Sequence, residues 1–321
     1  MNKISMFELV HEELARVEAE LITVIHSPVG LITEIGDHLV EAGGKRLRPA
    51  LYLLCARSAK REIDDVLPMA VALELIHMAT LVHDDVIDNS MTRRGMITAN
   101  ARWGNQISVL SGDYLFAKAF SAVAGVGGKM MKILTNTICV LCEGEVVQIQ
   151  SMFDAQQSEE DYVQRIAKKT ADFIAASCQL GGIAGCFSER DVQAFYQYGY
   201  SLGIAFQITD DILDITASQK QLGKPVGNDL RQGILTLPAI RAMQNSKYGQ
   251  ELRNIVLSKD MSDHNVERAL EMICATDALD YSNKRVEDFL EKARTVLPQS
   301  LDEGVRKALF EISDFVGLRK Y

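Results

Sequence analysis

Two short acidic clusters repeat one pattern far apart in the chain. Residues 84–88 read Asp-Asp-Val-Ile-Asp, and residues 210–214 read Asp-Asp-Ile-Leu-Asp. Carboxylates among apolar neighbours are costly to bury unless cations pair with them. On a helix, the first and last aspartate of each cluster lie one turn apart on one face. The pattern favours two platforms for a hard divalent cation over two solvated acidic faces. The predicted Mg²⁺ ligands are Asp84, Asp85, Asp88, Asp210, Asp211 and Asp214.

Basic residues stand near the first cluster. A Gly-Gly pair at 43–44 is followed by Lys45, Arg46 and Arg48, and Pro49 suits a first helical position. Backbone amides, the helix dipole and three cations would converge there on an anion, although a solvated basic loop is an equal alternative. Arg93 and Arg94 follow Asp88 by five and six residues, and His77 lies two turns before Asp84 on the same face. For His77, a satisfied core histidine is the alternative.

Weaker candidates lie elsewhere. Lys169 and Thr170 stand on an otherwise apolar helix, Gln207 precedes Asp210 on one face, and Lys224 follows the second cluster. Taken one at a time, each is as consistent with a solvated or locally paired side chain as with a substrate contact. Together the parts indicate a site where metal stabilises a departing diphosphate and apolar helix walls exclude water from the remaining carbocation.

The elements that must position these residues read as helices. The chain has 321 residues, 47% of them apolar, and only 6 prolines. Apolar residues recur at helical spacing and no lasting strand alternation is present. We expect one all-α domain, residues 1–321, folded as a large helical bundle. The expected helices are 5–24, 29–42, 49–60, 63–88, 107–124, 129–152, 158–185, 189–216, 234–245, 248–257, 262–275, 278–296 and 301–317.

Charge and apolar patterning exclude some classes of protein. A net charge of −9 argues against a nucleic-acid partner bound through a general electrostatic field. No continuous apolar run reaches the roughly 18–20 residues of a spanning helix, and residues 1–20 lack signal-peptide order. We therefore expect a cytoplasmic protein without a transmembrane segment. Cys139 and Cys142 form Cys-x-x-Cys without a redox or zinc context, which predicts thiols packed in the core.

Six blocks of the sequence resemble the trans-isoprenyl diphosphate synthases, the polyprenyl synthetase family, in that family's order. The resemblance covers nearly the whole chain, and it implies an isoprenoid synthase-like bundle around a deep central cavity, with Mg²⁺ as cofactor. It also implies a dimer, with a homodimer and a heterodimer both open. The blocks are Gly43 to Pro49, Leu81 to Arg94, Gly112 and Asp113, Lys169 and Thr170, Phe206 to Asp214, and Gly223 to Asp229.

The resemblance implies two substrates, isopentenyl diphosphate and an allylic diphosphate, and a role for each basic residue. The aspartates would hold Mg²⁺ on the allylic diphosphate. Lys45, Arg48, His77 and Arg94 would bind isopentenyl diphosphate. The allylic partner would contact Arg93, Lys169, Thr170, Gln207 and Lys224. The residues expected to act in catalysis are Asp84, Asp85, Asp88, Arg93, Lys169, Asp210 and Asp211.

Cavity depth sets product length in this family. Ala79 and Thr80 stand where short-chain members often carry a bulky residue, so small side chains here imply a long product. The chain looks closest to the heptaprenyl or octaprenyl type that supplies quinone side chains. One departure is Ile234, where many members have Lys. The alternatives are a farnesyl or geranylgeranyl diphosphate synthase, a catalytic subunit that needs a partner chain, a terpene cyclase, and a non-enzymatic helical subunit.

Overall fold

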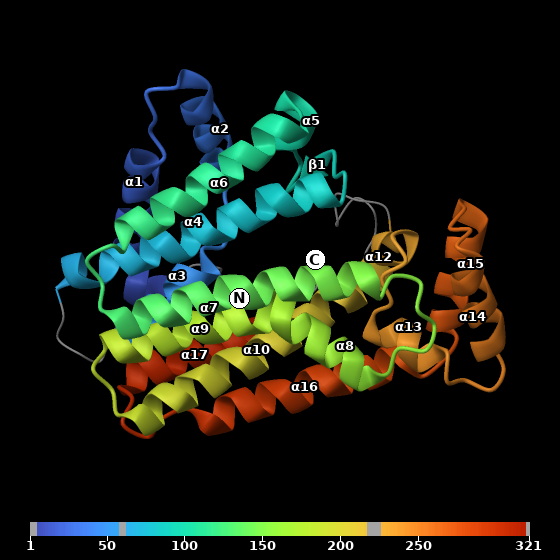
Figure 1. Ribbon diagram of the computed structural model, residues 1–321. Coiled ribbons are helices and arrows are strands. Elements are labelled where there is room, and N and C mark those ends of the chain that lie inside the picture. The colour runs from blue at the N-terminus through green and yellow to red at the C-terminus, as the bar shows by residue number, and fades with distance from the viewer. Residues whose placement is uncertain (1–4, 58–61, 217–225, 319–321) are drawn as a thin grey trace. The chain divides into compact units, whose positions relative to one another are not determined.

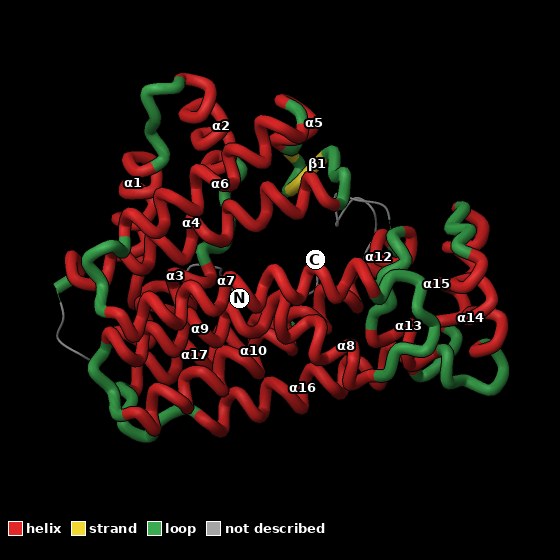
Figure 2. Tube along the Cα trace, viewed as in Figure 1, coloured by secondary structure: helices red, strands yellow, loops and turns green. Residues whose placement is uncertain are grey.

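The computed structural model describes residues 5–57, 62–216 and 226–318, and helices dominate it (Figures 1 and 2). The expected all-α fold is confirmed. Within the described ranges, the strands are β1 (Thr92–Arg93) and β2 (Met96–Ile97), which pair antiparallel. The chain divides into two compact units, which we describe separately.

The first unit contains residues 1–133, 177–193 and 300–309. Its helices α1, α3 and α6 pack against α4, a helix that is apolar on nearly every side and is therefore enclosed. Gly112 allows α6 to approach α4 closely, because a Cβ there would lie 2.1 Å from Nε2 of His83. Its helical elements are η1 (Ser5–Val10), α1 (His11–Val24), α2 (Gly30–Glu41), α3 (Leu47–Ala56), α4 (Ile63–Ile87), α5 (Ala99–Trp103) and α6 (Asn105–Ala122).

Helix α4 is long and apolar enough, by length and composition, to cross a membrane. However, 67% of its most apolar stretch is buried inside the protein, which is typical of a core helix. The enclosed helix carries His77 and the first aspartate cluster at its C-terminal end.

The second unit contains residues 134–176, 194–299 and 310–321. In α10, Cβ atoms on Gly199 and Gly203 would lie within 2.7 and 2.5 Å of the Cα atoms of Ala175 and Ala171, so these helices touch backbone to backbone. Helices α7, α9, α10 and α17 contribute residues to both units. The helical elements are α7 (Gly128–Gln150), α8 (Glu159–Ile166), the π-helical η2 (Ala167–Ala171), α9 (Asp172–Ala184), α10 (Glu189–Thr216), α12 (Asn228–Arg231), α13 (Leu237–Ala242), α14 (Gly249–Ser258), α15 (Asp263–Cys274), α16 (Ala278–Val296) and α17 (Glu303–Gly317).

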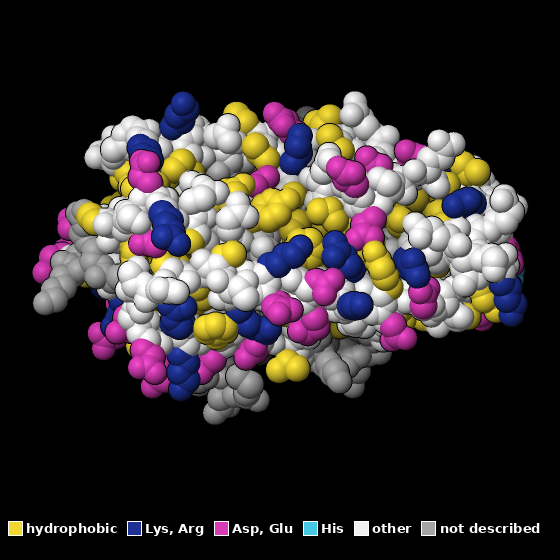
Figure 3. All heavy atoms as spheres, turned by 90° about the horizontal axis from the view of Figure 1, so that it is seen from below, with side chains coloured by type: hydrophobic (Ala, Val, Ile, Leu, Met, Phe, Trp, Pro, Cys, Tyr) yellow, Lys and Arg dark blue, Asp and Glu magenta, His cyan; other side chains and the backbone are white. Residues whose placement is uncertain are grey.

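Two local predictions are wrong. Helix α3 begins at Leu47, so Pro49 is its third residue and not its first. Cys139 and Cys142 are exposed on α7 and do not pack in the core. Lys224 lies outside the described residues, so its predicted role is not placed. On the face drawn in Figure 3, Lys and Arg side chains are interspersed with Asp and Glu.

Candidate active site

The first aspartate cluster lies at the end of α4. The Asp88 amide donates to the Asp84 carbonyl at 2.8 Å, so the helical register continues through Asp88. Asp84 and Asp88 are half-buried, whereas Asp85 is 4% exposed and accepts a hydrogen bond from Nε of Arg93 at 2.7 Å. Burial raises the pKa of Asp85, and Arg93 opposes that rise. Asp84 and Asp88 are therefore the carboxylates on the face of His77, and Asp85 holds Arg93.

A tight hairpin presents the two arginines that follow this cluster. Arg93 pairs with Met96, which leaves Arg94 and Gly95 as the turn residues. Both have positive φ, 54° and 80°, as in the turns that suit two-residue hairpins. The Thr98 amide donates to the Met91 carbonyl at 3.1 Å and closes the hairpin. The backbone position of Arg94 is thus set by the turn.

The basic turn at residues 43–48 is organised by a buried carboxylate. Arg46, in a left-handed conformation with φ 48°, donates to Oε1 of Glu74 at 2.8 Å and of Glu18 at 3.0 Å. Glu74 is 2% exposed and Arg46 is 6% exposed. Arg46 is therefore engaged inside the protein, and the expected convergence of three cations is reduced to Lys45 and Arg48. Lys45 is exposed. Burial lowers the pKa of Arg48 to about 10, and the nearby charge of Arg94 acts in the same direction.

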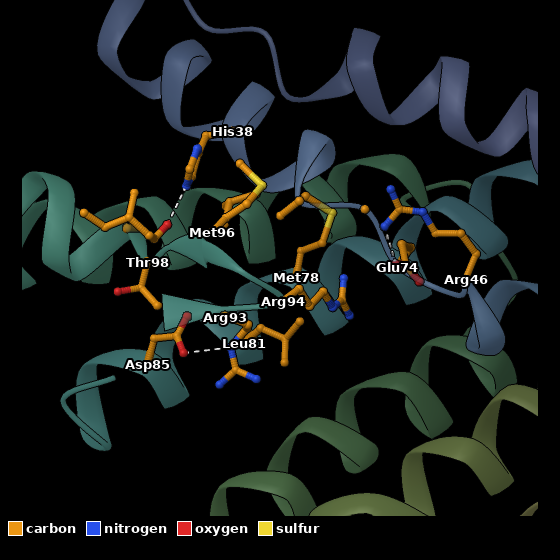
Figure 4. A pocket seen from close by; sticks show the side chains of 15 residues that line it. His38, Arg46, Glu74, Met78, Leu81, Asp85, Arg93, Arg94, Met96 and Thr98 are labelled. Atoms are coloured by element: carbon orange, nitrogen blue, oxygen red, sulfur yellow. Dashed lines mark hydrogen bonds and ion pairs between the residues drawn. The ribbon is translucent and has the colours of Figure 1, made fainter. Parts of the chain in front are cut away.

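A pocket lies between α2, α4 and the hairpin (Figure 4). One side of α4 lines it with Glu74, Met78, Leu81 and Asp85, and Arg94 closes it from the hairpin. The remaining lining residues are His38, Leu39, Ala42, Gly43, Arg46, Arg93, Met96, Ile97, Thr98 and Ala99.

His77 does not line this pocket. It points to the neighbouring side of α4, one turn from Glu74 and two turns from Asp84. Burial lowers the pKa of His77 well below its usual range, and Arg48, Arg94, Arg93 and Arg46 add to the effect in that order. The imidazole is therefore neutral at pH 7, in a field that attracts an anion.

The second aspartate cluster is positioned by α10 in the second unit. Asp211 is 4% exposed and accepts hydrogen bonds from the Tyr162 hydroxyl at 2.7 Å and from Nε2 of Gln207 at 2.9 Å. Burial raises the pKa of Asp211 to about 6, although these two donors oppose the shift. Asp210 is half-buried, and Asp214 accepts a hydrogen bond from the Asp229 amide at 3.1 Å. The first cluster thus has one deeply buried carboxylate, Asp85, and the second has two, Asp211 and Asp214, which is 3% exposed; each of the three accepts a hydrogen bond from a protein donor.

The π-helical segment η2 brings Lys169 and Thr170 to the same region. The Thr170 hydroxyl donates to Oε1 of Gln207 at 2.9 Å, and Gln207 in turn donates to Asp211. Lys169 pairs with Glu145 at 2.8 Å. A Cβ on Gly144 would lie 2.8 Å from the Lys169 amide, so α7 approaches this segment closely. Single π-helical turns are frequent at functional sites.

Three residues of these networks were not expected from the sequence. Glu74 accepts a hydrogen bond from Arg46 of the basic turn, and the Tyr162 hydroxyl donates to Asp211. The buried Arg165 donates to the Leu235 carbonyl at 2.5 Å. A signal existed for Glu74, since a lone carboxylate within an apolar helix three residues before His77 requires a cation.

The donor chemistry suits Mg²⁺. Within the described residues, no three side chains of His, Cys, Asp or Glu gather into a preformed cation site. Mg²⁺ is usually held by one or two carboxylates together with substrate phosphates and water. The half-buried Asp84, Asp88 and Asp210 therefore fit an ion whose other ligands come from a diphosphate.

Comparison with known proteins identifies the family. The chain is 39% identical to heptaprenyl diphosphate synthase component 2 of Geobacillus stearothermophilus, over 99% of both chains. It is 37% identical to octaprenyl diphosphate synthase of Escherichia coli, over 98% of both chains. A polyprenyl synthase from Caulobacter crescentus, solved with calcium and isoprenyl diphosphate, matches with a TM-score of 0.93 and 34% identity, covering 100% of this chain and 98% of that one. Residues 29–273 match the polyprenyl synthetase family model, and the chain belongs to that family.

Proposed function

We propose that this chain is a long-chain trans-prenyltransferase that condenses isopentenyl diphosphate with an allylic diphosphate to form a polyprenyl diphosphate. The new C–C bond forms after the allylic diphosphate ionises. The observation that carries the proposal is the cluster of Arg48, His77 and Arg94 beside the aspartates at the end of α4. A cationic site next to a metal platform suits two separate diphosphates. Family membership and the two long-chain relatives support the same reading.

On the allylic side, the carboxylates of both aspartate clusters would hold Mg²⁺: Asp84, Asp85, Asp88, Asp210, Asp211 and Asp214. When bound, Mg²⁺ supplies charge that stabilises the departing diphosphate. The calcium and isoprenyl diphosphate in the Caulobacter relative support this assignment. Arg93, Lys169, Thr170 and Gln207 would orient the allylic diphosphate, and Lys224, outside the described residues, is proposed with them.

On the other side, Lys45, Arg48, His77 and Arg94 would bind isopentenyl diphosphate. Because the His77 ring is neutral, it offers a directed hydrogen bond without a further charge. The homoallylic double bond then attacks the allylic cation and a proton leaves. Ala79 and Thr80 would leave the hydrocarbon cavity deep enough for repeated additions.

The whole chain, residues 1–321, is proposed to act as one cytoplasmic catalytic domain. We propose that it forms a homodimer, because apolar residues stand exposed on one face of α7, among them Val146 and Ile149. The relative named component 2 favours a second candidate, a catalytic subunit that works with a different chain.

The test is to incubate the purified chain alone with labelled isopentenyl diphosphate, an allylic starter and Mg²⁺. We expect chain elongation, and a loss of at least about 100-fold in kcat for Asp84→Ala and for Asp210→Ala, because each removes a ligand of the metal that stabilises the leaving group. Asp280→Ala is the control, since Asp280 is exposed on α16. Circular dichroism should show the same helicity in all variants.

The outcomes separate the alternatives. Full activity in either aspartate variant would reject the metal platforms. Ionisation of the allylic substrate without consumption of isopentenyl diphosphate would indicate a terpene cyclase. Activity that appears only after a second chain is added would favour the partner-dependent subunit, and none under any condition would favour a non-enzymatic one.

A further inference from the structure

Gly44 and Arg94 come from distant parts of the sequence and touch. A Cβ built on Gly44 would lie 2.8 Å from Nη1 of Arg94 and 3.4 Å from its Cζ and Nη2. Carbon and nitrogen atoms do not approach to 2.8 Å without displacement, so any side chain at position 44 competes with this guanidinium for the same space.

The adjacent Gly43 is glycine because of its backbone conformation and not because of a neighbouring side chain. Gly43 has a φ of 64°, a left-handed conformation that favours glycine whatever surrounds it. Gly44 is outside the positive-φ region, so its backbone would accept alanine. What excludes a side chain at Gly44 is the Arg94 guanidinium.

The backbone of Arg94 is fixed, although its side chain is flexible. Its backbone is set by the hairpin turn, with φ 54°, between the paired residues Arg93 and Met96. Its guanidinium is attracted by the buried Glu74 and repelled by Arg46 and Arg93. The contact with Gly44 places the guanidinium of Arg94 over the basic turn, and the missing side chain at Gly44 makes that position available.

We infer that Gly44 is a positioning residue for the bound diphosphate: it leaves the space through which Arg94 reaches the anion held by the 45–48 turn. The inference rests on the proposed isopentenyl diphosphate site. It assigns to Gly44 no contact with the substrate. Its effect passes through the guanidinium of Arg94 alone.

The variant Gly44→Ala tests this inference. Because the clashing atom is the end of a flexible side chain, Arg94 gives way and the midpoint of thermal unfolding stays unchanged. The Kd for isopentenyl diphosphate, measured by calorimetry, should rise about tenfold, as should its KM, because one charge-assisted hydrogen bond is lost. The KM of the allylic substrate and kcat should stay within about twofold. Gly30→Ala is the control, since nothing lies within 4 Å of its Cβ position.

A double-mutant cycle makes the test specific. In an Arg94→Ala background the guanidinium is absent, so adding Gly44→Ala should leave the Kd unchanged. An equal rise in both backgrounds, or none in the wild-type background, would overturn the inference. If Arg94→Ala itself left the Kd unchanged, the proposed substrate site would fail, and with it the role of Gly44 there. A crystal structure of Gly44→Ala decides separately whether the guanidinium is displaced.

Discussion

At the scale of single residues, His77 is the group whose protonation the surroundings control most clearly. Burial and four arginines lower its pKa in the folded protein, whereas in the unfolded chain it titrates near 6.5. Below pH 6.5 the unfolded chain therefore binds a proton that the folded protein does not. The stability that this difference contributes is complete above pH 6.5 and is lost as the pH falls below it.

The corresponding prediction concerns His77→Gln, which keeps a neutral hydrogen-bonding side chain. Between pH 6.5 and 5.5 the free energy of unfolding of the wild type should fall more steeply than that of the variant. The difference is at most about 1.4 kcal/mol per pH unit, reduced because the ring is partly exposed. Urea denaturation at several pH values measures it. His264→Gln, at an exposed site on α15, is the control, and parallel curves for wild type and His77→Gln would contradict the prediction.

The sequence predicted which residues carry charge at the site but not how they pair. Spacing along a helix correctly placed His77, Asp84 and Asp88 on one face. Spacing did not separate Arg46 from Arg48, because the hydrogen bond that engages Arg46 with Glu74 joins residues 28 positions apart. The Tyr162 hydroxyl on Asp211 was missed for the same reason, since it spans 49 positions.

At the scale of elements, the long helices were predicted within a few residues, because an apolar stripe repeated over several turns is a strong local signal. The helix expected over 158–185 instead contains the π-helical η2, which carries Lys169 and Thr170. Short elements were missed: α5, α12 and the hairpin of β1 and β2 are too brief to show a period. The hairpin depends on positive φ at Arg94, and arginine is not a residue type from which such a turn is predicted.

Ala79 and Thr80 lie on different sides of α4, and this difference indicates which of them controls product length. Ala79 is 0% exposed, so Ala79→Tyr would overpack the core at a cost of about 1–3 kcal/mol. Thr80 is half-buried and lies on the side of His77 and Asp84. We therefore expect Thr80→Phe to shorten the product by one or more five-carbon units while the rate of the first condensation changes little. Chromatography of the dephosphorylated products measures this, with Thr80→Val as the control. A product of unchanged length would remove Thr80 from the wall of the cavity.

At the scale of the whole molecule, the exposed face of α7 bears on assembly. Cys139, Cys142, Val146 and Ile149 follow one another at spacings of three and four residues, which places them on one stripe. The sequence predicted core positions for the two thiols. An apolar helical stripe has the same pattern whether it packs within its own chain or against a partner chain. Only the folded chain distinguishes these cases, and the part of it that the structure describes leaves these side chains open: Val146 is 54% exposed and Ile149 is 49% exposed.

If a second copy covers this stripe, charge on it should prevent association. We expect the double variant Val146→Asp and Ile149→Asp to sediment as a monomer at concentrations where the wild type is a dimer, because each carboxylate would be buried without a partner. Its helicity should be unchanged, since both side chains are exposed in the single chain. The control is Leu257→Asp, which introduces one such carboxylate at an exposed leucine on α14, 62% exposed, and should leave the dimer intact. A double variant that still sediments as a dimer would place the interface elsewhere. A wild type that is itself monomeric would direct the search to a different partner chain, because the stripe would then remain uncovered in the isolated protein.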